Sequence, residues 1–119
     1  MVTSQAPSGD ELVEVFAALA NPIRLRIVAT LATKGRDYVS SLARELEISR
    51  PLLHMHLQRL EAAGLVVGNL ELSDDGKAMK FFEVTDLDLT LTPAILAEAA
   101  KTLTRPEPQK RSGTDKEQA

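Results

Sequence analysis

Residues 40–65 read SSLARELEISRPLLHMHLQRLEAAGL, and the second half of this stretch carries the clearest helix signals in the chain. Ser49 is a good N-cap, and Pro51 falls in the first turn, where its missing N–H does no harm. Gly64 suits the left-handed backbone position that follows many helices. We therefore predict a helix over residues 49–63.

The first half of the stretch predicts a shorter helix over residues 40–47. Leu42, Ala43 and Leu46 form a small apolar stripe, and Ser40 is placed to cap it. Two short helices joined by a tight turn make a helix-turn-helix. The turn carries Glu47 where glycine is common, which costs energy if a positive φ is required there.

The helix predicted over residues 49–63 has two contrasting sides. Leu53, Leu57 and Leu60 recur at helical spacing, so that side should be buried. The remaining positions have no acidic residue before Glu61, and they are Arg50, His54, Met55, His56, Gln58 and Arg59. Arginine and glutamine suit DNA base edges, whereas serine and the helix N-terminus suit phosphates, so this surface favours DNA over the alternative of a plain solvated helix face.

A β-hairpin is expected directly after this helix. Residues 65–72 alternate and are rich in β-formers, residues 73–77 read Ser-Asp-Asp-Gly-Lys, and residues 79–85 alternate again. A hairpin beside a DNA-reading helix is a wing. A short strand at Tyr38 and Val39, before the helix-turn-helix, is also possible from the sequence.

Two lysines of this wing are expected to contact DNA. Lys77 and Lys80 lie near its tip and would touch phosphate across the minor groove. Asp74 and Asp75 oppose close approach to phosphate, so an ordinary surface turn is the alternative.

Two helices are predicted upstream of the helix-turn-helix. Ser8 and Glu11 have capping-box spacing for the first, whose apolar residues are Leu12, Val15, Phe16 and Leu19. Asn21 and Pro22 cap and open the second, whose buried stripe comprises Ile23, Ile27, Val28 and Leu31 before Gly35 ends it.

The last predicted helix spans residues 93–103. Thr92 is its cap and Pro93 its first residue, after an alternating linker over residues 86–91. One side of it is apolar, through Ile95, Leu96, Ala99, Ala100 and Leu103. This side either completes the core or pairs two subunits.

Length and composition indicate one domain. We assign residues 10–104 to it, residues 1–9 to a flexible tail and residues 105–119 to a charged, proline-broken, disordered tail. The N-terminus lacks the features of a signal peptide and no apolar run could span a bilayer, so we expect a cytoplasmic protein with no membrane partner. The chain has no cysteine, which excludes disulfides, thiolate metal sites and cysteine nucleophiles.

The net charge of −3 argues against indiscriminate binding to nucleic acid. The position of the charges matters more than their sum. Residues 49–60 carry only basic charge, whereas acids gather in residues 10–14 and 86–88. We expect those acidic segments to face away from DNA.

Three segments together resemble the ArsR family of winged-helix repressors and metal-responsive regulators. Residues 16–31, FAALANPIRLRIVATL, contain A-L-A-N-P-I-R-L-R-I, which looks like the family's opening signature. Residues 39–65 are similar to its helix-turn-helix, and the predicted hairpin follows as it does in the family. The expected fold is therefore mainly α with a small β-hairpin, a winged helix-turn-helix of the α+β class.

The resemblance implies a transcriptional regulator that binds double-stranded DNA as a homodimer, with each recognition helix in one half of a near-palindromic operator. The family's S-x-H-L element appears as His54-Met55-His56-Leu57, with His54 in place of the serine. The residues expected to bind DNA are Ser49, Arg50, His54, His56, Gln58, Arg59, Lys77 and Lys80. The resemblance also implies dimerisation through the first and last helices, at Leu12, Val15, Phe16, Ile95, Leu96, Ala99 and Leu103.

The family's metal-sensing sites are mostly absent. The cysteine pair is missing, and the last helix offers only Glu98 as a ligand. His54 and His56 suit nickel or zinc, but residues two apart on a helix point roughly 200° away from each other, so each would need ligands from elsewhere. A nickel- or zinc-responsive regulator is thus one alternative function.

A winged-helix module that binds protein is the second alternative, and the acidic balance allows it. Steep loss of DNA affinity with rising salt would favour DNA binding as the function, because counterions are released when phosphates are neutralised. An enzyme is not expected, because the sequence has no nucleophile–base set, no glycine-rich phosphate loop and no H-E-x-x-H spacing.

Overall fold

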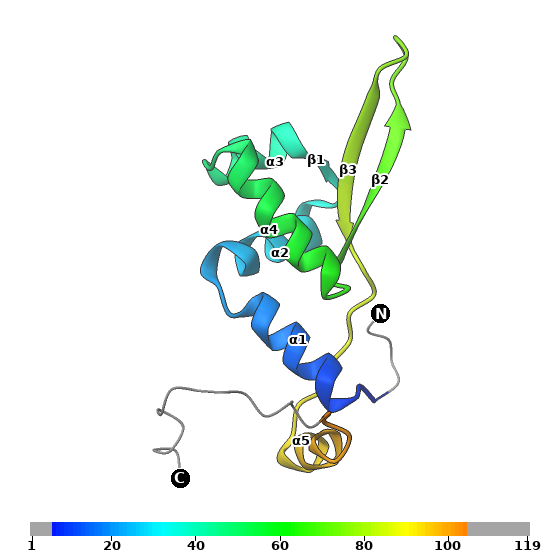
Figure 1. Cartoon of the computed structure of the whole chain (residues 1–119). Helices are drawn as coiled ribbons and strands as arrows, with labels where there is room; N and C mark the ends of the chain where they lie inside the picture. The colour runs from blue at the N-terminus through cyan, green and yellow to red at the C-terminus, as the bar shows by residue number, and fades with distance from the viewer. Residues whose placement is uncertain (1–5, 105–119) are drawn as a thin grey trace, which may run out of the picture.

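The computed structural model describes residues 6–104, so residues 1–5 and all of the tail predicted over residues 105–119 lie outside the described residues. The last helix lies at the opposite end of the molecule from the β-hairpin (Figure 1). In chain order the elements are α1 (Gly9–Leu19), α2 (Pro22–Lys34), β1 (Asp37–Tyr38), α3 (Val39–Leu46), α4 (Arg50–Ala62), β2 (Val66–Leu72), β3 (Ala78–Val84) and α5 (Pro93–Ala100). Helix α1 begins at Gly9, the last residue assigned to the N-terminal tail.

The first two helices start as the sequence predicts. Ser8 and Glu11 form a capping box, in which the backbone N–H of Ser8 donates to Glu11 Oε1 at 2.9 Å and the N–H of Glu11 donates to Ser8 Oγ at 3.1 Å. The Asn21 side chain accepts from the first N–H groups of α2, and Gly35 ends that helix. The Asn21 cap fixes the break between α1 and α2.

Helices α3 and α4 form the predicted helix-turn-helix. Ser49 caps α4 by accepting from the N–H of Leu52 at 3.2 Å. The turn is closed by Glu47 in the left-handed conformation, with φ 59° and ψ 44°, and within residues 6–104 no other non-glycine residue has a positive φ. The conformational cost anticipated at Glu47 is therefore present.

The predicted cap of α3 is wrong. Helix α3 begins one residue earlier than expected, its N-cap is Tyr38, and this cap makes no side-chain hydrogen bond. The Asp37 carboxylate instead accepts from the N–H of Tyr38 and from the Ser41 hydroxyl. Pairing of Tyr38 with Phe81 in the sheet holds Tyr38 extended, so the chain enters the helix directly at Val39.

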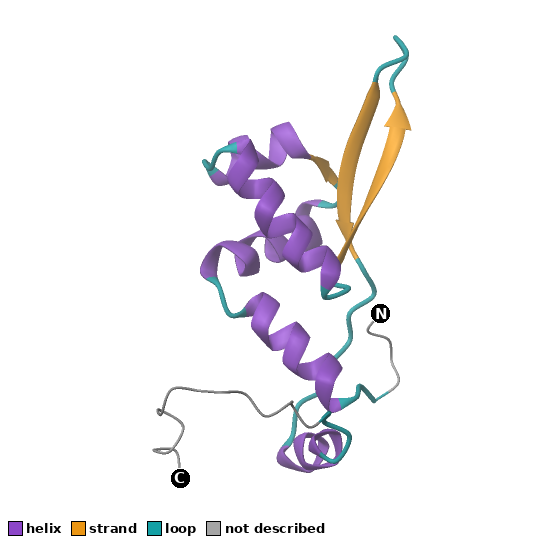
Figure 2. Ribbon diagram, in the orientation of Figure 1, coloured by secondary structure: helices purple, strands orange, loops and turns teal. Residues whose placement is uncertain are grey.

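The three strands form an antiparallel sheet in the order β1-β3-β2, so the predicted hairpin is joined by a short third strand. The hairpin projects beyond the helices (Figure 2). At its base Val66 and Phe82 are buried in the core, whereas Leu70 and Leu72 on the same face are 69% and 75% exposed. The alternation of apolar and polar residues continues along β2 to its outer end. The outer half of the wing has no helix to pack against, so its leucines stay exposed.

The core lies where α1, α2, α3, α4 and the base of the hairpin meet. The side of α4 that was predicted to be buried is confirmed, because Leu53, Leu57 and Leu60 are at most 1% exposed. Leu42 of α3 and Ile27 of α2 are equally buried and pack in the same cluster. This core anchors α4 by its leucine side and leaves its opposite side outward.

Helix α5 is three residues shorter than predicted and packs on α1. The Thr102 hydroxyl after its end accepts from the N–H of Gly9 at 2.8 Å and donates to the carbonyl of Ala99 at 2.9 Å. A Cβ on Gly9 would lie 2.5 Å from the Ala99 carbonyl oxygen. Glycine at this position therefore permits the close approach of α1 to α5.

Within residues 6–104, no single helix is long and apolar enough to cross a membrane. Helices α1 and α2 together have that length and composition, but they meet at an angle of 96°. Both contribute residues to the core.

Candidate nucleic-acid interface

The outer side of α4 carries most of the predicted DNA-contacting residues. Arg50, His54 and Gln58 follow one another at four-residue intervals, which places them on one face of the helix. All three are exposed, and so are Ser49 and Arg59. From Ser49 to Leu60 the helix carries no acidic side chain, so this surface is basic along its length.

His56 is a correction to the predicted interface. Its side chain is 4% exposed and lies between α4 and α2, where it cannot meet DNA directly. The sequence contained the signal: His56 follows Leu53 by three residues and precedes Leu60 by four, so it shares the buried side of the helix with the leucines. In contrast to His56, the α4 residues His54 and Gln58 are exposed.

Arg24 of α2, which the sequence reasoning did not single out, is the partner of His56. Its guanidinium donates from Nη1 to His56 Nδ1 at 3.1 Å and from Nε to the Ala18 carbonyl at 2.7 Å, and it is 8% exposed. An arginine can only donate, so Nδ1 must be the unprotonated acceptor nitrogen of the ring. Burial, and then the nearby charges of Arg24 and Arg59, lower the pKa of His56 below its usual 6.5. His56 is therefore a neutral structural residue.

A cleft of about 280 Å³ lies between α4 and the outer part of the wing. Its walls come from the start of α3, the first turns of α4 and the outer part of β3. The lining residues are Tyr38, Val39, Ser40, Arg50, His54, Ala78, Met79 and Lys80. The fold thus brings the predicted wing residue Lys80 together with Arg50 and His54, while Lys77 belongs to the wing tip outside this lining.

Lys80 is held in place by its neighbours on the sheet. Its ammonium lies 5.3 Å from the centre of the Phe82 ring, within cation–π range. Gly68 is the cross-strand partner of Phe82, and a Cβ there would lie 2.7 Å from the Phe82 ring and 2.8 Å from Lys80 Cε. The absence of a side chain at Gly68 makes room for both side chains.

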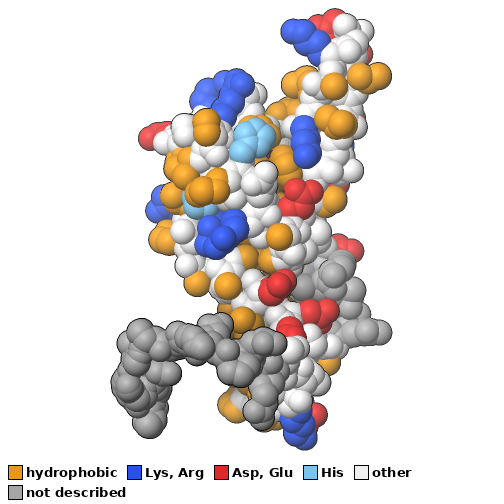
Figure 3. Space-filling view, in the orientation of Figure 1, with side chains coloured by type: hydrophobic (Ala, Val, Ile, Leu, Met, Phe, Trp, Pro, Cys, Tyr) orange, Lys and Arg blue, Asp and Glu red, His pale blue; other side chains and the backbone are white. Residues whose placement is uncertain are grey.

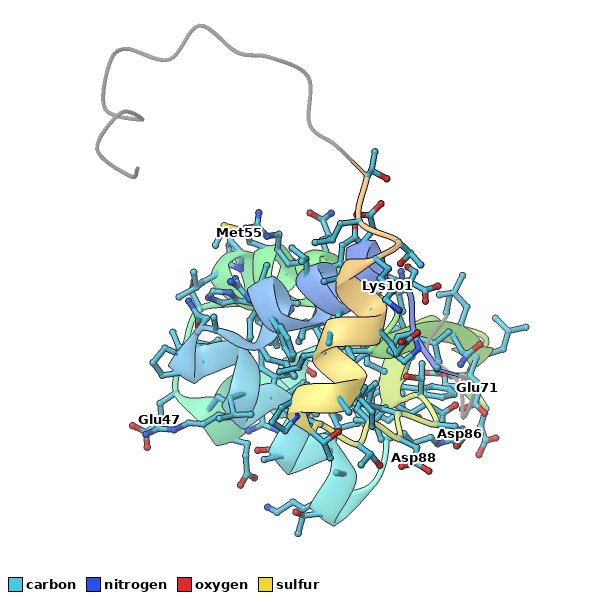
Figure 4. The ribbon with its side chains drawn as sticks, turned by 90° about the horizontal axis from the view of Figure 1, so that it is seen from below. Glu47, Met55, Glu71, Asp86, Asp88 and Lys101 are labelled. Carbon is cyan, nitrogen blue, oxygen red and sulfur yellow. The ribbon has the colours of Figure 1, made fainter. Side chains whose placement is uncertain are left out.

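Charge is unevenly distributed on the face of the molecule seen in Figure 3. In the space-filling view, basic and histidine side chains gather over the recognition helix and the base of the wing, and most of the acidic side chains on this face lie below them (Figure 3). The Asp86 and Asp88 side chains of the linker lie on the side away from Met55 of α4 (Figure 4). The net negative charge of the chain is thus compatible with a basic surface over α4.

Comparisons with known proteins agree with this architecture. Residues 19–69 match the family model of a helix-turn-helix domain. An uncharacterised helix-turn-helix transcriptional regulator of Methanocaldococcus jannaschii is 33% identical over 86 residues, which cover 72% of this chain and 88% of that protein. The chain belongs to the helix-turn-helix transcriptional regulators.

Solved structures show the same fold. A transcriptional regulator homologue from Pyrococcus horikoshii aligns with a TM-score of 0.54 at 26% identity, covering 78% of this chain and 86% of that one. A homodimeric winged helix-turn-helix DNA-binding domain from Mycobacterium bovis, a possible ArsR-family regulator, aligns with a TM-score of 0.53 at 23% identity, covering 77% and 74%. The relatives of the present chain are transcriptional regulators and not enzymes, in agreement with the prediction.

The wing of this helix-turn-helix regulator is held at its base by contacts of residues that sequence reasoning missed. The Arg36 guanidinium lies 3.9 Å from the centre of the Phe81 ring, and its Nη2 lies 3.4 Å from Glu71 Oε2 on β2. Tyr38 packs edge-on against the same ring, at 5.9 Å between centres. These contacts fix the angle at which the wing leaves the body.

The wing tip is less suited to DNA. The Ser73 hydroxyl donates to the Asp75 carboxylate and, with the Lys77 N–H nearby, lowers the pKa of Asp75, which stays ionised. Two carboxylates, Asp74 and Asp75, therefore flank Lys77 and oppose phosphate.

Within one chain, the structure does not bring the candidate metal ligands together. His54 is exposed, His56 is buried with Nδ1 already paired, and Glu98 belongs to α5. Residues 6–104 contain no group of three or more histidine, aspartate or glutamate side chains that could hold a metal ion. Nickel or zinc binding stays a prediction without support from these residues.

The residues predicted to form the dimer interface fall into two groups. Leu12, Val15 and Ala99 are buried by their own chain, so they are not available to a partner. Phe16, Leu96 and Leu103 are 40–47% exposed, and Ile95 is half-buried. The available apolar surface of the predicted interface is therefore this second group.

Proposed function

We propose that this chain is an ArsR-type regulator that binds DNA sequence-specifically as a homodimer, with α4 in the major groove and the wing across the neighbouring backbone. The observation that carries the proposal is the exposed, acid-free side of α4, on which Arg50, His54 and Gln58 are aligned. Its opposite side is fixed in the core by Leu53, Leu57 and Leu60, so the reading side is presented rigidly. Arg and Gln supply the paired donors and acceptors that base edges match.

The dimer is supported by α5, whose sequence PAILAEAA is apolar apart from Glu98. A helix that is apolar nearly all round is normally covered, yet Ala99 is its only buried residue. Figure 4 shows α5 lying across α1 with no other described element in front of it. A second copy of the chain, packing α5 and Phe16 against their counterparts, would remove this surface from water.

Additional apolar surface adjoins α5. A groove of about 580 Å³ runs between the residues that precede α1 and the side of α5, with Ala6, Pro7 and Ile95 among its apolar walls. The M. bovis domain with the same fold is itself a homodimer. A symmetric dimer would place two recognition helices about 34–36 Å apart, one turn of DNA, and would read a near-palindromic operator.

Footprinting on the DNA upstream of the gene tests the proposal. We expect protection of two half-sites with centres about one helical turn apart, with affinity that falls steeply as salt rises. Parallel reactions with nickel and with zinc test the metal-responsive alternative. No protection and no mobility shift at low salt would overturn DNA binding and favour the protein-binding alternative.

A further inference from the structure

We propose that the groove beside α5 binds a small organic cation with a large apolar body, and that this ligand regulates DNA binding. The groove encloses about 580 Å³ and lies at the opposite end of the molecule from the wing. Residues 6–8 and Glu11 form one wall, and α5 with Thr102 forms the other. The binding site goes beyond the proposed function, and its regulatory role rests on that function.

The size and the lining of the groove match a small-molecule site. Its volume falls within the range of about 300–1,000 Å³ that such sites usually have. Five of the nine lining residues are apolar, and they are Ala6, Pro7, Ala94, Ile95 and Ala99. An apolar body in the groove would remove their surface from water, which favours binding.

The two walls of the groove are held together by close contacts. The N–H of Gly9 donates to the Thr102 hydroxyl at 2.8 Å, and the Thr102 hydroxyl donates to the Ala99 carbonyl at 2.9 Å. The capping box of Ser8 and Glu11 fixes the first turn of α1 beside this contact. Because the walls are already ordered, little freedom is lost when a ligand enters.

The charged groups of the groove favour a cation over an anion. Glu11 and Glu98 are acidic, and none of the nine lining residues is basic. Glu11 accepts from the N–H of Ser8 at 2.9 Å, and a carboxylate has capacity for further donors. Glu98 pairs with Lys101 at 2.9 Å, but both side chains of this pair are at least 70% exposed, so water screens it. An anionic ligand would meet two carboxylates, whereas a cation is attracted by them.

The side of α5 that lines the groove differs from the side that carries Leu96. Ile95, Glu98 and Ala99 are three and four residues apart, which places them on one side of the helix. Leu96, which does not line the groove, lies about 100° around the helix from Ile95. A second copy that packs against Leu96 therefore leaves room for a ligand on the neighbouring side.

Helix α1 connects the groove to the recognition helix. Its first turn belongs to the groove wall, and near its other end the Ala18 carbonyl accepts from Arg24 Nε at 2.7 Å. The same guanidinium donates to His56 of α4 at 3.1 Å. A ligand that shifts α1 therefore acts on a buried junction that holds α4, and this is the route by which it would change DNA binding.

Titration of the full chain with tetraphenylphosphonium tests the site, and tetraphenylborate, an anion of the same shape, is the matched control. The NMR signals of the Ile95 and Ala99 methyl groups report on the groove alone. We expect saturable shifts with the phosphonium and an affinity for the borate that is lower by about tenfold or more, because the carboxylates attract one ion and repel the other. Equal affinities, or no shift with the phosphonium, would overturn the cation site.

Variants locate the bound probe. Ala94→Trp places an indole in the groove and should weaken phosphonium binding by more than about tenfold, whereas Ala97→Trp, at an exposed alanine of α5 outside the lining, should not. Glu11→Gln keeps a side chain that can complete the capping box and should weaken binding by about 2- to 5-fold. Glu14→Gln, on α1 outside the lining, is its control. Wild-type affinity in Ala94→Trp would overturn the location of the site.

A comparison of the wild type with Leu96→Glu tests whether a second copy fills the groove instead. Phosphonium shifts in both proteins support the ligand site. Shifts in a monomeric Leu96→Glu protein together with none in a dimeric wild type would assign the groove to the second copy and overturn the ligand site.

Operator affinity tests the regulatory role. Saturating phosphonium should change the affinity of the wild type for the footprinted duplex by about 5-fold or more, and should leave that of Ala94→Trp unchanged. An equal affinity with and without the probe would overturn regulation while the binding site stands. Phosphonium binding by a protein that binds no duplex at all would overturn the proposed function and the regulatory role, and would leave the binding site in place.

Discussion

Arg24 of α2 donates a hydrogen bond of 3.1 Å to Nδ1 of His56 on the recognition helix. The same guanidinium donates to the Ala18 carbonyl near the end of α1, so one buried side chain joins three helices. A buried charge is tolerated only when its donors are paired, which makes this junction sensitive to the loss of either acceptor. It links α1, which packs on α5, to the helix proposed to read DNA.

The first prediction concerns pH. Because the pKa of His56 is lowered in the folded protein, the unfolded chain binds more protons below pH 6.5 than the folded chain does. The free energy of unfolding should therefore be constant above about pH 7.5, fall as the pH drops through 6.5, and continue to fall until the folded pKa is passed. Urea unfolding between pH 5 and 8 measures this dependence.

Variants identify the residue responsible. His56→Gln should remove most of this slope, whereas His54→Gln, at an exposed site on the same helix, should keep it. An unchanged slope in His56→Gln would show that another group carries the titration.

The second prediction concerns the turn of the helix-turn-helix. Glu47 has φ 59°, a conformation that costs an L-residue about 1–2 kcal/mol and costs glycine far less. Glu47→Gly should raise the free energy of unfolding by about 0.5–1 kcal/mol, since the greater entropy of unfolded glycine offsets part of the gain. Thermal and urea unfolding measure the change, and Glu45→Gly, inside α3, serves as the control that should be destabilised. Destabilisation of Glu47→Gly would mean that the Glu47 side chain makes a stabilising contact.

Local signals predicted most of the fold, because caps and periodicity are properties of neighbouring residues. Ser49, Asn21 and the leucines of α4 are where such signals place them. The errors arose where tertiary contacts decide. Ser40 is not the N-cap of α3, because Tyr38 pairs with a strand that is remote in sequence and the helix begins directly after it.

The candidate site shows the same division. His54 and Arg50 follow from helix periodicity. His56 was placed on the exposed side although its spacing from Leu53 and Leu60 puts it on the buried side with the leucines. The sequence could not predict the roles of Arg24, which contacts His56, and of Gly68, which makes room for Lys80. Their roles depend on which residue faces them across the fold, and no local pattern encodes that.

The third prediction concerns base reading. Arg50→Ala should weaken binding to the footprinted operator by about 1–3 kcal/mol and relax preference at one base pair in each half-site, if its guanidinium meets a base edge. Arg26→Ala removes an exposed arginine of α2 and should leave affinity unchanged. Titrations on operator and on single-base variants measure both effects. Equal losses on all sequences would reassign Arg50 to phosphate contact.

The fourth prediction concerns the dimer. Leu96 is 42% exposed on α5, so Leu96→Glu should leave the fold of the chain intact but place a charge in the proposed interface. Sedimentation velocity should show monomer where wild type is dimeric, and operator affinity should fall by more than tenfold, since each half-site is then bound alone. Ala97→Glu, at another exposed position of α5, tests how far the interface extends. A dimeric Leu96→Glu would place the interface elsewhere.

The fifth prediction concerns the glycine beneath Lys80. In Gly68→Ala the new Cβ would lie 2.7 Å from the buried Phe82 ring and 2.8 Å from Lys80 Cε, so one of them must move. The ring is confined by the core and the lysine is exposed at the surface, so Lys80 should be displaced, at a cost of about 1–3 kcal/mol in stability. Because Lys80 is expected to touch a DNA phosphate, Gly68→Ala should also lower the slope of log affinity against log salt for DNA binding. Asn69→Ala, one residue along on the opposite face of the same strand, is the control for a general loss of wing stability. A Gly68→Ala protein with lowered stability and a wild-type salt slope would show that the lysine reaches its ligand without this support.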